Sequence, residues 1–247
     1  MTSRSRPLQD RVALVTGASR GIGRAVALRL DRLGAQLALI QRTRADETAQ
    51  QLAQPPVVVQ CDLSRAEDGE AAVGQIAKDL GKIDVCICNA GTIHREPALE
   101  VEVREFRRVI ELNVVSTFAV ARAAARHMPA GGAIVLIGSV LSFQGGLQVP
   151  AYAASKAAVA NLARALANEW ASRGIRVNAI APGYIDNEQT APLRADAERR
   201  RQIDERIPAG RWGTNEDVAD AVAWLVCSES GYVNGHVLAV DGGWLGR

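Results

Sequence analysis

The chain has 247 residues, of which 48% are hydrophobic, and its formal net charge is +2. This length accommodates one α/β domain with a buried core, so we expect residues 1–247 to form a single domain. Because the charge is nearly balanced, the composition favours neither a nucleic-acid partner nor a membrane surface. The N-terminal stretch lacks the apolar segment of a signal peptide, and no apolar run reaches membrane-spanning length, which predicts a cytoplasmic protein.

The cysteines indicate buried, reduced thiols and no metal site. One residue separates Cys86 from Cys88, whereas metal ligands usually leave about two to four residues between cysteines. No histidine pair accompanies them.

Apolar β-type segments alternate with amphipathic helical segments along the whole chain. The predicted strands are Val12–Thr16, Gln36–Ile40, Pro56–Cys61, Ile83–Asn89, Ala133–Ser139, Ile175–Ala181 and Val237–Val240. Most are apolar at nearly every position, as expected for parallel strands buried on both faces. The alternation predicts a single-domain Rossmann fold: a doubly wound, seven-stranded parallel sheet with helices on both faces.

The segment from Gly183 to Arg211 is the least regular part of the chain and carries many charges. It follows a predicted strand, and in a doubly wound sheet ligands bind beyond the carboxyl ends of the strands. We therefore expect this segment to be a lid over a substrate.

A glycine-rich loop joins the first predicted strand to the first helix. Gly17 allows a tight turn after the strand, Gly21 lets backbone N–H groups approach a pyrophosphate, and Gly23 permits close packing of helix and strand. This context predicts a dinucleotide site. The loop residues expected to contact the dinucleotide are Gly17, Ser19, Arg20, Gly21, Ile22 and Gly23.

The end of the second predicted strand bears on the choice of cofactor. A carboxylate there favours NAD, whereas a nearby arginine favours NADP. This chain has Gln41 at that point, followed by Arg42, and Arg20 lies in the glycine loop. Two guanidinium groups suit a 2′-phosphate, so we expect NADP(H) to be favoured, with NAD(H) as the alternative.

Four polar residues form a candidate catalytic set. Tyr152 and Lys156 are four residues apart, which places them on one face of a helix. Ser139 ends the fifth predicted strand, and Asn113 interrupts an otherwise apolar helix. Each alone has an ordinary structural explanation.

Together these residues suit the reduction of a ketone. A phenol with a pKa of about 10 is a poor acid or base near neutrality. The charge on Lys156 lowers the pKa of Tyr152, which then exchanges a proton with the substrate oxygen. Ser139 is expected to hold the same oxygen, and Asn113 to anchor a water that links Lys156 to solvent.

The chain resembles a short-chain dehydrogenase/reductase over essentially its whole length. The matching residues are the Thr16–Gly23 loop, Cys61-Asp62-Leu63, Asn89-Ala90-Gly91, Asn113, Ser139, Tyr152-x-x-x-Lys156 and Pro182-Gly183. The resemblance implies a homotetramer paired through the helices that contain Asn113 and Tyr152. One position differs, because many relatives carry a threonine where this chain has Asn187.

The resemblance also implies further contacts with the cofactor. Tyr152 and Lys156 would both contact the cofactor, and Lys156 would hold the nicotinamide ribose. The other implied contacts are Asp62 and Leu63 at the adenine, Asn89, Ala90 and Gly91 at the sheet edge, and Pro182, Gly183 and Ile185 at the nicotinamide.

Four further segments are similar to one group within that family, the 2-deoxy-D-gluconate 3-dehydrogenases, also described as 2-keto-3-deoxygluconate dehydrogenases. These segments span residues 91–100, 141–146, 206–213 and 240–247. The similarity implies a small sugar acid as substrate. The residues expected to bind it are Ser139 and Tyr152, His94 and Arg95 for its carboxylate, and Ser142 and Gln148 for its hydroxyls.

Two other functions fit parts of the pattern. A 3-ketoacyl-acyl-carrier-protein reductase shares the four catalytic residues but needs a basic landing surface, for which Arg122, Arg126 and residues 199–201 are the candidates. Acidic residues flank residues 199–201, which favours a solvated helix face. A non-catalytic dinucleotide sensor does not need all four catalytic positions, yet all four are occupied.

Overall fold

Seven strands form one parallel sheet in the computed structural model, which describes residues 6–43 and 46–247. The strands are β1 (Val12–Thr16), β2 (Gln36–Gln41), β3 (Val57–Gln60), β4 (Val85–Cys88), β5 (Ala133–Ile137), β6 (Arg176–Pro182) and β7 (Val237–Val240). Their order across the sheet is β3-β2-β1-β4-β5-β6-β7. The chain therefore adds strands outward from β1 in one direction up to β3 and then in the other direction from β4 to β7, which places the switch point of the sheet between β1 and β4. This is the predicted doubly wound sheet, in a single Rossmann-like α/β domain.

The predicted strand bounds match the structure closely, with one difference that matters. β5 ends at Ile137, so Ser139 lies beyond the strand and does not end it as predicted. Its backbone is still extended, but its side chain caps a 3₁₀ turn formed by Val140–Ser142. The difference arises because strand pairing stops before the capping residue.

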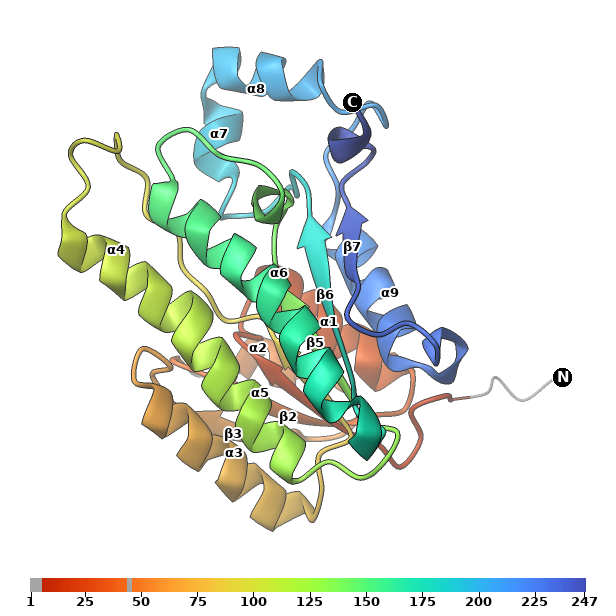
Figure 1. The fold of residues 1–247 in the computed structure, drawn as a ribbon. Helices are drawn as coiled ribbons and strands as arrows, with labels where there is room; N and C mark the ends of the chain where they lie inside the picture. The colour runs from red at the N-terminus through yellow and green to blue at the C-terminus, as the bar shows by residue number, and fades with distance from the viewer. Residues whose placement is uncertain (1–5, 44–45) are drawn as a thin grey trace, which may run out of the picture.

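Helices cover both faces of the sheet, as Figure 1 shows. One face carries α3 (Ala66–Leu80), α4 (Val103–Ile110), α5 (Ser116–Arg126) and α6 (Pro150–Trp170). The other face carries α1 (Gly21–Arg32) and α9 (Asn215–Val226), with the short α2 (Asp46–Ala49) beside α1. Each layer of helices packs on its face of the sheet through a separate apolar core.

The predicted lid contains two short helices, α7 (Ala191–Ala195) and α8 (Ala197–Asp204). They lie at the top of Figure 1, beyond the carboxyl ends of the strands and next to the C-terminus. A small third core joins this lid to the rest of the molecule. Its buried members are Val140, Ile203, Ile207 and Trp244.

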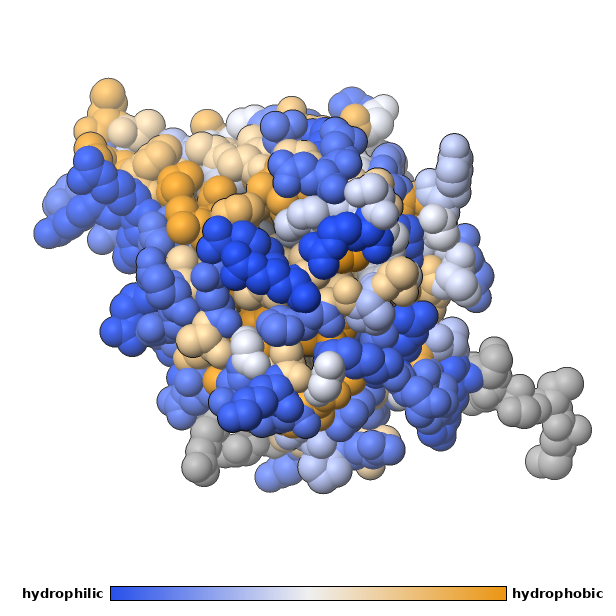
Figure 2. Space-filling view, turned by 60° about the horizontal axis from the view of Figure 1, so that its bottom comes forward, coloured by the Kyte–Doolittle hydropathy of each residue, from blue (hydrophilic) through white to orange (hydrophobic). Residues whose placement is uncertain are grey.

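Part of the surface is hydrophobic. Figure 2 shows hydrophobic side chains gathered at one margin, on the side where α4 lies in Figure 1. The exposed large hydrophobic residues include Leu99 before α4, Val103 and Phe106 on α4, and Val115 directly before α5. The homotetramer implied by the family resemblance stays a prediction.

Within the described ranges, no helix is long and apolar enough to cross a membrane.

Candidate active site

The glycine loop has the geometry of an anion-binding turn. Gly17 and Gly21 have φ angles of +66° and +56°, which favour glycine. A Cβ on Gly23 would lie 2.2 Å from the carbonyl oxygen of Gly17, so only glycine fits. α1 starts at Gly21, no side chain caps it, and its first turn has no acidic residue. The N–H groups at this helix end therefore remain available to a phosphate.

Asn89, after β4, holds this loop in place. Its side-chain nitrogen donates hydrogen bonds to the carbonyl oxygens of Thr16 and Gly17, each at 3.0 Å. The Thr16 hydroxyl in turn accepts hydrogen bonds from the backbone N–H groups of Asn89 and Ala90. The predicted Asn89-Ala90 segment thus fixes the carboxyl end of β4 against the glycine loop.

The end of β2 fits the ribose of a dinucleotide. The Gln41 side chain is 3% exposed, and neither its oxygen nor its nitrogen has a hydrogen-bond partner. A ligand hydroxyl would satisfy both atoms. The two predicted arginines differ in position. Arg42 is exposed next to Gln41, whereas Arg20 forms a 2.5 Å ion pair with Glu188 of the lid segment.

The remaining predicted cofactor residues fall into three groups. The side chains of Leu63 and Ile185 are buried in the apolar cores. Asp62 is exposed, and the N–H of Ser64 lowers the pKa of its carboxyl group, with a further contribution from Arg42. The others border the sheet edge. They are the half-buried Ser19 and Ile22 in the loop, Gly91 after β4, and Pro182 and Gly183 at the end of β6.

Tyr152 and Lys156 lie together on α6. The Lys156 ammonium is 5.5 Å from the centroid of the Tyr152 ring and donates a 2.7 Å hydrogen bond to the carbonyl oxygen of Ile137. Burial lowers the pKa of Lys156 to about 8. Burial also raises the pKa of the Tyr152 phenol. The side chains of Gln189 and Ser139 act in the opposite direction and lower it.

Ser139 is held next to Tyr152 by a capping box. Its hydroxyl oxygen accepts a hydrogen bond from the N–H of Leu141 at 3.1 Å. The hydroxyl oxygen of Ser142 in turn accepts a hydrogen bond from the N–H of Ser139. The Ser142 hydroxyl then donates a 2.7 Å hydrogen bond to the carbonyl oxygen of Lys156. Ser142 therefore positions Ser139 against α6, and the structure does not place it in the substrate cavity as predicted.

Asn113 lies in a single π-helical turn, Glu111–Val115, between α4 and α5. Its side chain exchanges hydrogen bonds with the backbone N–H and carbonyl of Thr92, at 2.8 and 2.9 Å. It also donates to the hydroxyl of Ser155 on α6, at 2.9 Å. The amide thus fixes the loop after β4 against the helix that carries Tyr152, and its predicted contact with a water stays a prediction.

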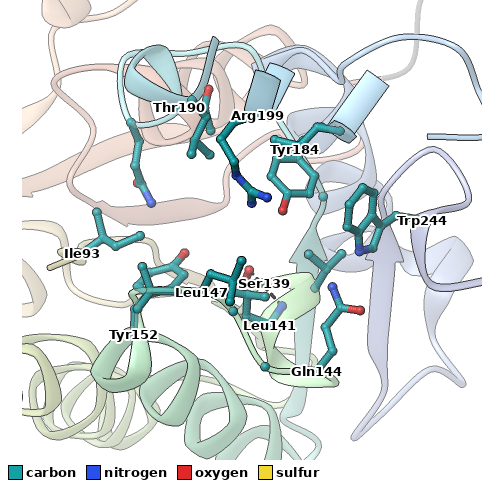
Figure 3. Close-up of a pocket in the computed structure, with 18 of the residues that line it drawn as sticks. Ile93, Ser139, Leu141, Gln144, Leu147, Tyr152, Tyr184, Thr190, Arg199 and Trp244 are labelled. Atoms are coloured by element: carbon teal, nitrogen blue, oxygen red, sulfur yellow. Dashed lines mark hydrogen bonds between the residues drawn. The ribbon is translucent and has the colours of Figure 1, made fainter. Parts of the chain in front are cut away.

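A cavity of about 390 Å³ opens above Ser139 and Tyr152. Figure 3 shows Arg199 reaching into it from the lid, with Tyr184 beside it and Trp244 at the end opposite Tyr152. Arg95, Arg199 and Arg206 all line the cavity, and no aspartate or glutamate does so among the described residues. The volume suits a small-molecule ligand.

Only some of the predicted substrate residues reach this cavity. Ser139, Tyr152 and Arg95 line it, whereas His94 and Gln148 do not. The His94 ring is engaged outside the cavity with Glu96, at 2.9 Å, because consecutive side chains of an extended loop point in opposite directions. Gln148 has a φ of +60°, and its carbonyl oxygen accepts the N–H of Glu96.

The sequence missed several residues of the site. Arg199 was interpreted as part of a solvated helix face, but it lines the cavity, as do Gln189 and Trp244. The interpretation holds for Arg200 and Arg201, which pair with acidic side chains of the lid. The sequence did hold an indication of this position. Arg199 and Ile203 are four residues apart and so share one face of a helix, which predicts that Arg199 faces inward with the apolar Ile203.

The four cysteines are free, and Cys86 and Cys88 lie with their sulfurs 3.8 Å apart in β4. No group of three or more histidine, cysteine, aspartate or glutamate side chains gathers as a metal site in the part of the chain that the structure describes.

Comparison with known proteins places the chain in a family. Residues 17–245 match the profile of a family described as enoyl-(acyl carrier protein) reductase. The 2-dehydro-3-deoxy-D-gluconate 5-dehydrogenase of Escherichia coli (strain K12) is 43% identical over 246 residues, covering 97% of each chain. The gluconate 5-dehydrogenase of Gluconobacter oxydans (strain 621H) is 40% identical, covering 94% of this chain and 93% of that protein.

A solved structure from Agrobacterium tumefaciens, of a candidate 2-deoxy-D-gluconate 3-dehydrogenase with bound NADP, matches with a TM-score of 0.92. It is 40% identical, and the match covers 99% of this chain and 100% of that chain. These matches span the glycine loop, the helix that carries Tyr152 and the lid. The chain therefore belongs to the short-chain dehydrogenase/reductase family, as an oxidoreductase that acts on CH–OH groups.

Proposed function

We propose that this chain interconverts a hydroxyl and a ketone on a small sugar acid, with a nicotinamide dinucleotide as cofactor. The observation that carries the proposal is the charge of the cavity above Ser139 and Tyr152. Three arginines line it and no carboxylate does so among the described residues, which favours an anionic substrate over a neutral sugar or alcohol. Relatives named as gluconate and deoxygluconate dehydrogenases support this class of substrate.

The chain's own residues manage the proton and the substrate oxygen. The dinucleotide, when bound, supplies the hydride donor or acceptor. Tyr152 gives its phenol proton to the substrate oxygen, or removes it in the reverse direction. Ser139, which lines the same cavity as Tyr152, holds that oxygen. The buried ammonium of Lys156 favours the tyrosinate form.

We further propose that NADP(H) is preferred to NAD(H). The neutral Gln41 and the adjacent Arg42 leave no carboxylate at the end of β2 to repel a 2′-phosphate. The solved relative from Agrobacterium tumefaciens contains NADP, and so does one from Beutenbergia cavernae that is 45% identical. NAD(H) stays the alternative cofactor.

The two rival functions find less support in the structure. Arg201 pairs with Glu198 and Glu205, and Arg122 pairs with Glu70, so these arginines are already neutralised by neighbours. This weakens the landing surface that an acidic carrier protein needs. A non-catalytic sensor is not favoured, because Ser139 and Tyr152 line one cavity and the Lys156 ammonium lies beside the Tyr152 ring.

The test is oxidation of a panel by the purified protein, with NAD and NADP used separately. The panel contains sugar acids, their neutral polyols and simple alcohols. We expect turnover of sugar acids, at higher efficiency with NADP. Silence on every sugar acid, together with reduction of a ketoacyl thioester in the reverse assay, contradicts the proposal and favours the carrier-protein reductase.

A further inference from the structure

The end of the cavity opposite Tyr152 is formed by the C-terminal segment. Trp244 lies there in a short 3₁₀ turn, Trp244–Gly246, and only 4% of its surface is exposed. Tyr184 packs against its ring with a centroid separation of 4.6 Å. The Arg206 guanidinium lies over the Trp244 ring, 3.9 Å from the ring centroid.

The indole nitrogen of Trp244 is buried and has no hydrogen-bond partner. Side-chain atoms in this state are few among the described residues, and they belong to Gln41, Arg194 and Trp244. Of these, only Trp244 lines the cavity above the catalytic residues. An indole N–H can only donate, so its missing partner has to be an acceptor oxygen.

The neighbours of Trp244 are also donors. The side-chain oxygen of Gln144 accepts a hydrogen bond from Arg206 at 3.3 Å, which leaves the Gln144 amide nitrogen free to donate. In Figure 3 that nitrogen is on the side toward the Trp244 indole. The Trp244 N–H, the Gln144 amide and the Arg206 guanidinium therefore surround one end of a cavity that is lined by no aspartate or glutamate among the described residues. A carboxylate satisfies all three, whereas a hydroxyl would leave the positive charge uncompensated.

We propose that Trp244, Arg206 and Gln144 form the subsite for the substrate carboxylate. This rests on the proposed function and assigns the two ends of the sugar acid. The reacting hydroxyl lies at Ser139 and Tyr152, and the carboxylate lies at the C-terminal segment.

The position of this subsite also predicts which hydroxyl of the sugar acid is oxidised. Because Trp244 lies at the opposite end of the cavity from Tyr152 (Figure 3), the reacting carbon is separated from the carboxylate by several carbons. An acid whose only hydroxyl is next to its carboxylate, such as lactate, is a poor substrate.

The test compares Trp244→Phe with Trp224→Phe. The first change removes the N–H and keeps an aromatic ring against Arg206, and the second alters a half-exposed tryptophan on α9, outside the cavity. For the best sugar acid of the panel we expect Trp244→Phe to raise KM about tenfold or more, since hydrogen bonds to charged groups are the stronger class. The affinity for NADPH changes little, and KM for the neutral polyol rises less than KM for the acid, because the polyol loses a hydrogen bond without charge. Trp224→Phe behaves as the parent protein.

Arg206 provides a second variant with a graded outcome. Arg206→Gln removes the charge and is expected to raise KM for the acid, whereas Arg206→Lys retains part of the selectivity for acid over polyol. An equal effect of Trp244→Phe on acid and polyol, or none on either, overturns the subsite while the proposed function stands.

Binding of D-gluconate, measured by calorimetry, separates the two proposals. If the parent protein oxidises no sugar acid but binds D-gluconate in a way that depends on Trp244, the proposed function fails and the subsite stands. If it neither oxidises nor binds a sugar acid, both are overturned.

Discussion

The Lys156 ammonium lies 5.5 Å from the centroid of the Tyr152 ring, one turn further along α6. Its hydrogen bond to the carbonyl of Ile137 ties α6 to the end of β5, where Ser139 follows. Burial lowers the pKa of the lysine and raises the pKa of the tyrosine, so the surroundings disfavour charge on both groups. The positive charge of Arg95 acts against burial at Tyr152 and lowers the pKa of its phenol.

Replacing Tyr152 by phenylalanine removes the proton donor and leaves the ring in place. We expect turnover to fall by about 10²–10⁴-fold or more, the usual contribution of a general acid or base. The dissociation constant for NADPH, measured by fluorescence titration, stays within about twofold of the parent value, since no phosphate contact is lost. Tyr232→Phe is the matched control, because Tyr232 is fully exposed and lies outside the cavity. Substantial activity in a clean Tyr152→Phe preparation would refute the assignment.

The depressed pKa of Lys156 predicts a pH dependence of stability. The unfolded chain keeps this lysine protonated up to about its ordinary pKa of 10.5, whereas the folded protein releases the proton near 8. Between these values the unfolded state binds more protons, so this group's contribution to the free energy of unfolding rises with pH. Urea unfolding of the apoprotein and of Lys156→Gln, between pH 7 and 10.5, measures the difference. A difference that stays constant over this range contradicts the burial of a titrating ammonium.

Arg42 is expected to discriminate between the two cofactors. Arg42→Ala removes the guanidinium beside Gln41, and we expect KM for NADPH to rise about tenfold because a charge-assisted hydrogen bond is lost. KM for NADH stays nearly unchanged. Arg104→Ala, on α4, serves as a control for loss of an exposed arginine. Equal effects on both cofactors would remove Arg42 from the 2′-phosphate site.

The close approach at Gly23 predicts a loss of both stability and cofactor binding. In Gly23→Ala the new Cβ would meet the carbonyl oxygen of Gly17 at 2.2 Å, so the loop has to move. We expect a loss of about 1–3 kcal/mol in the free energy of unfolding, as for other overpacked sites, with weaker binding of NADPH. Gly74→Ala, inside α3, is the control. Nothing lies within 4 Å of its added Cβ, and the change should stabilise the helix by about 0.5–1 kcal/mol. A fully stable Gly23→Ala protein with normal cofactor affinity would show that the loop tolerates the Cβ.

The sequence alone determined the features that depend on local spacing. Alternating apolar strands and amphipathic helices predicted the doubly wound sheet, because buried parallel strands have to be apolar on both faces. The spacing of Gly17, Gly21 and Gly23 predicted the phosphate turn. Gly17 and Gly21 have positive φ angles, and Gly23 leaves no room for a Cβ. Tyr152 and Lys156 were found because residues four apart share one face of a helix.

The tertiary structure decided the substrate end of the site. Arg95, Arg199 and Trp244 come from the loop after β4, the lid and the C-terminus, and no local pattern relates them. The contrast between His94 and Arg95 makes the same point, since neighbours in sequence face opposite ways and only Arg95 reaches the cavity. Which side chain of a loop points inward depends on what the loop packs against. The helix, strand and turn periods of this sequence therefore specify the cofactor scaffold, whereas the walls of the substrate cavity exist only once distant segments have met.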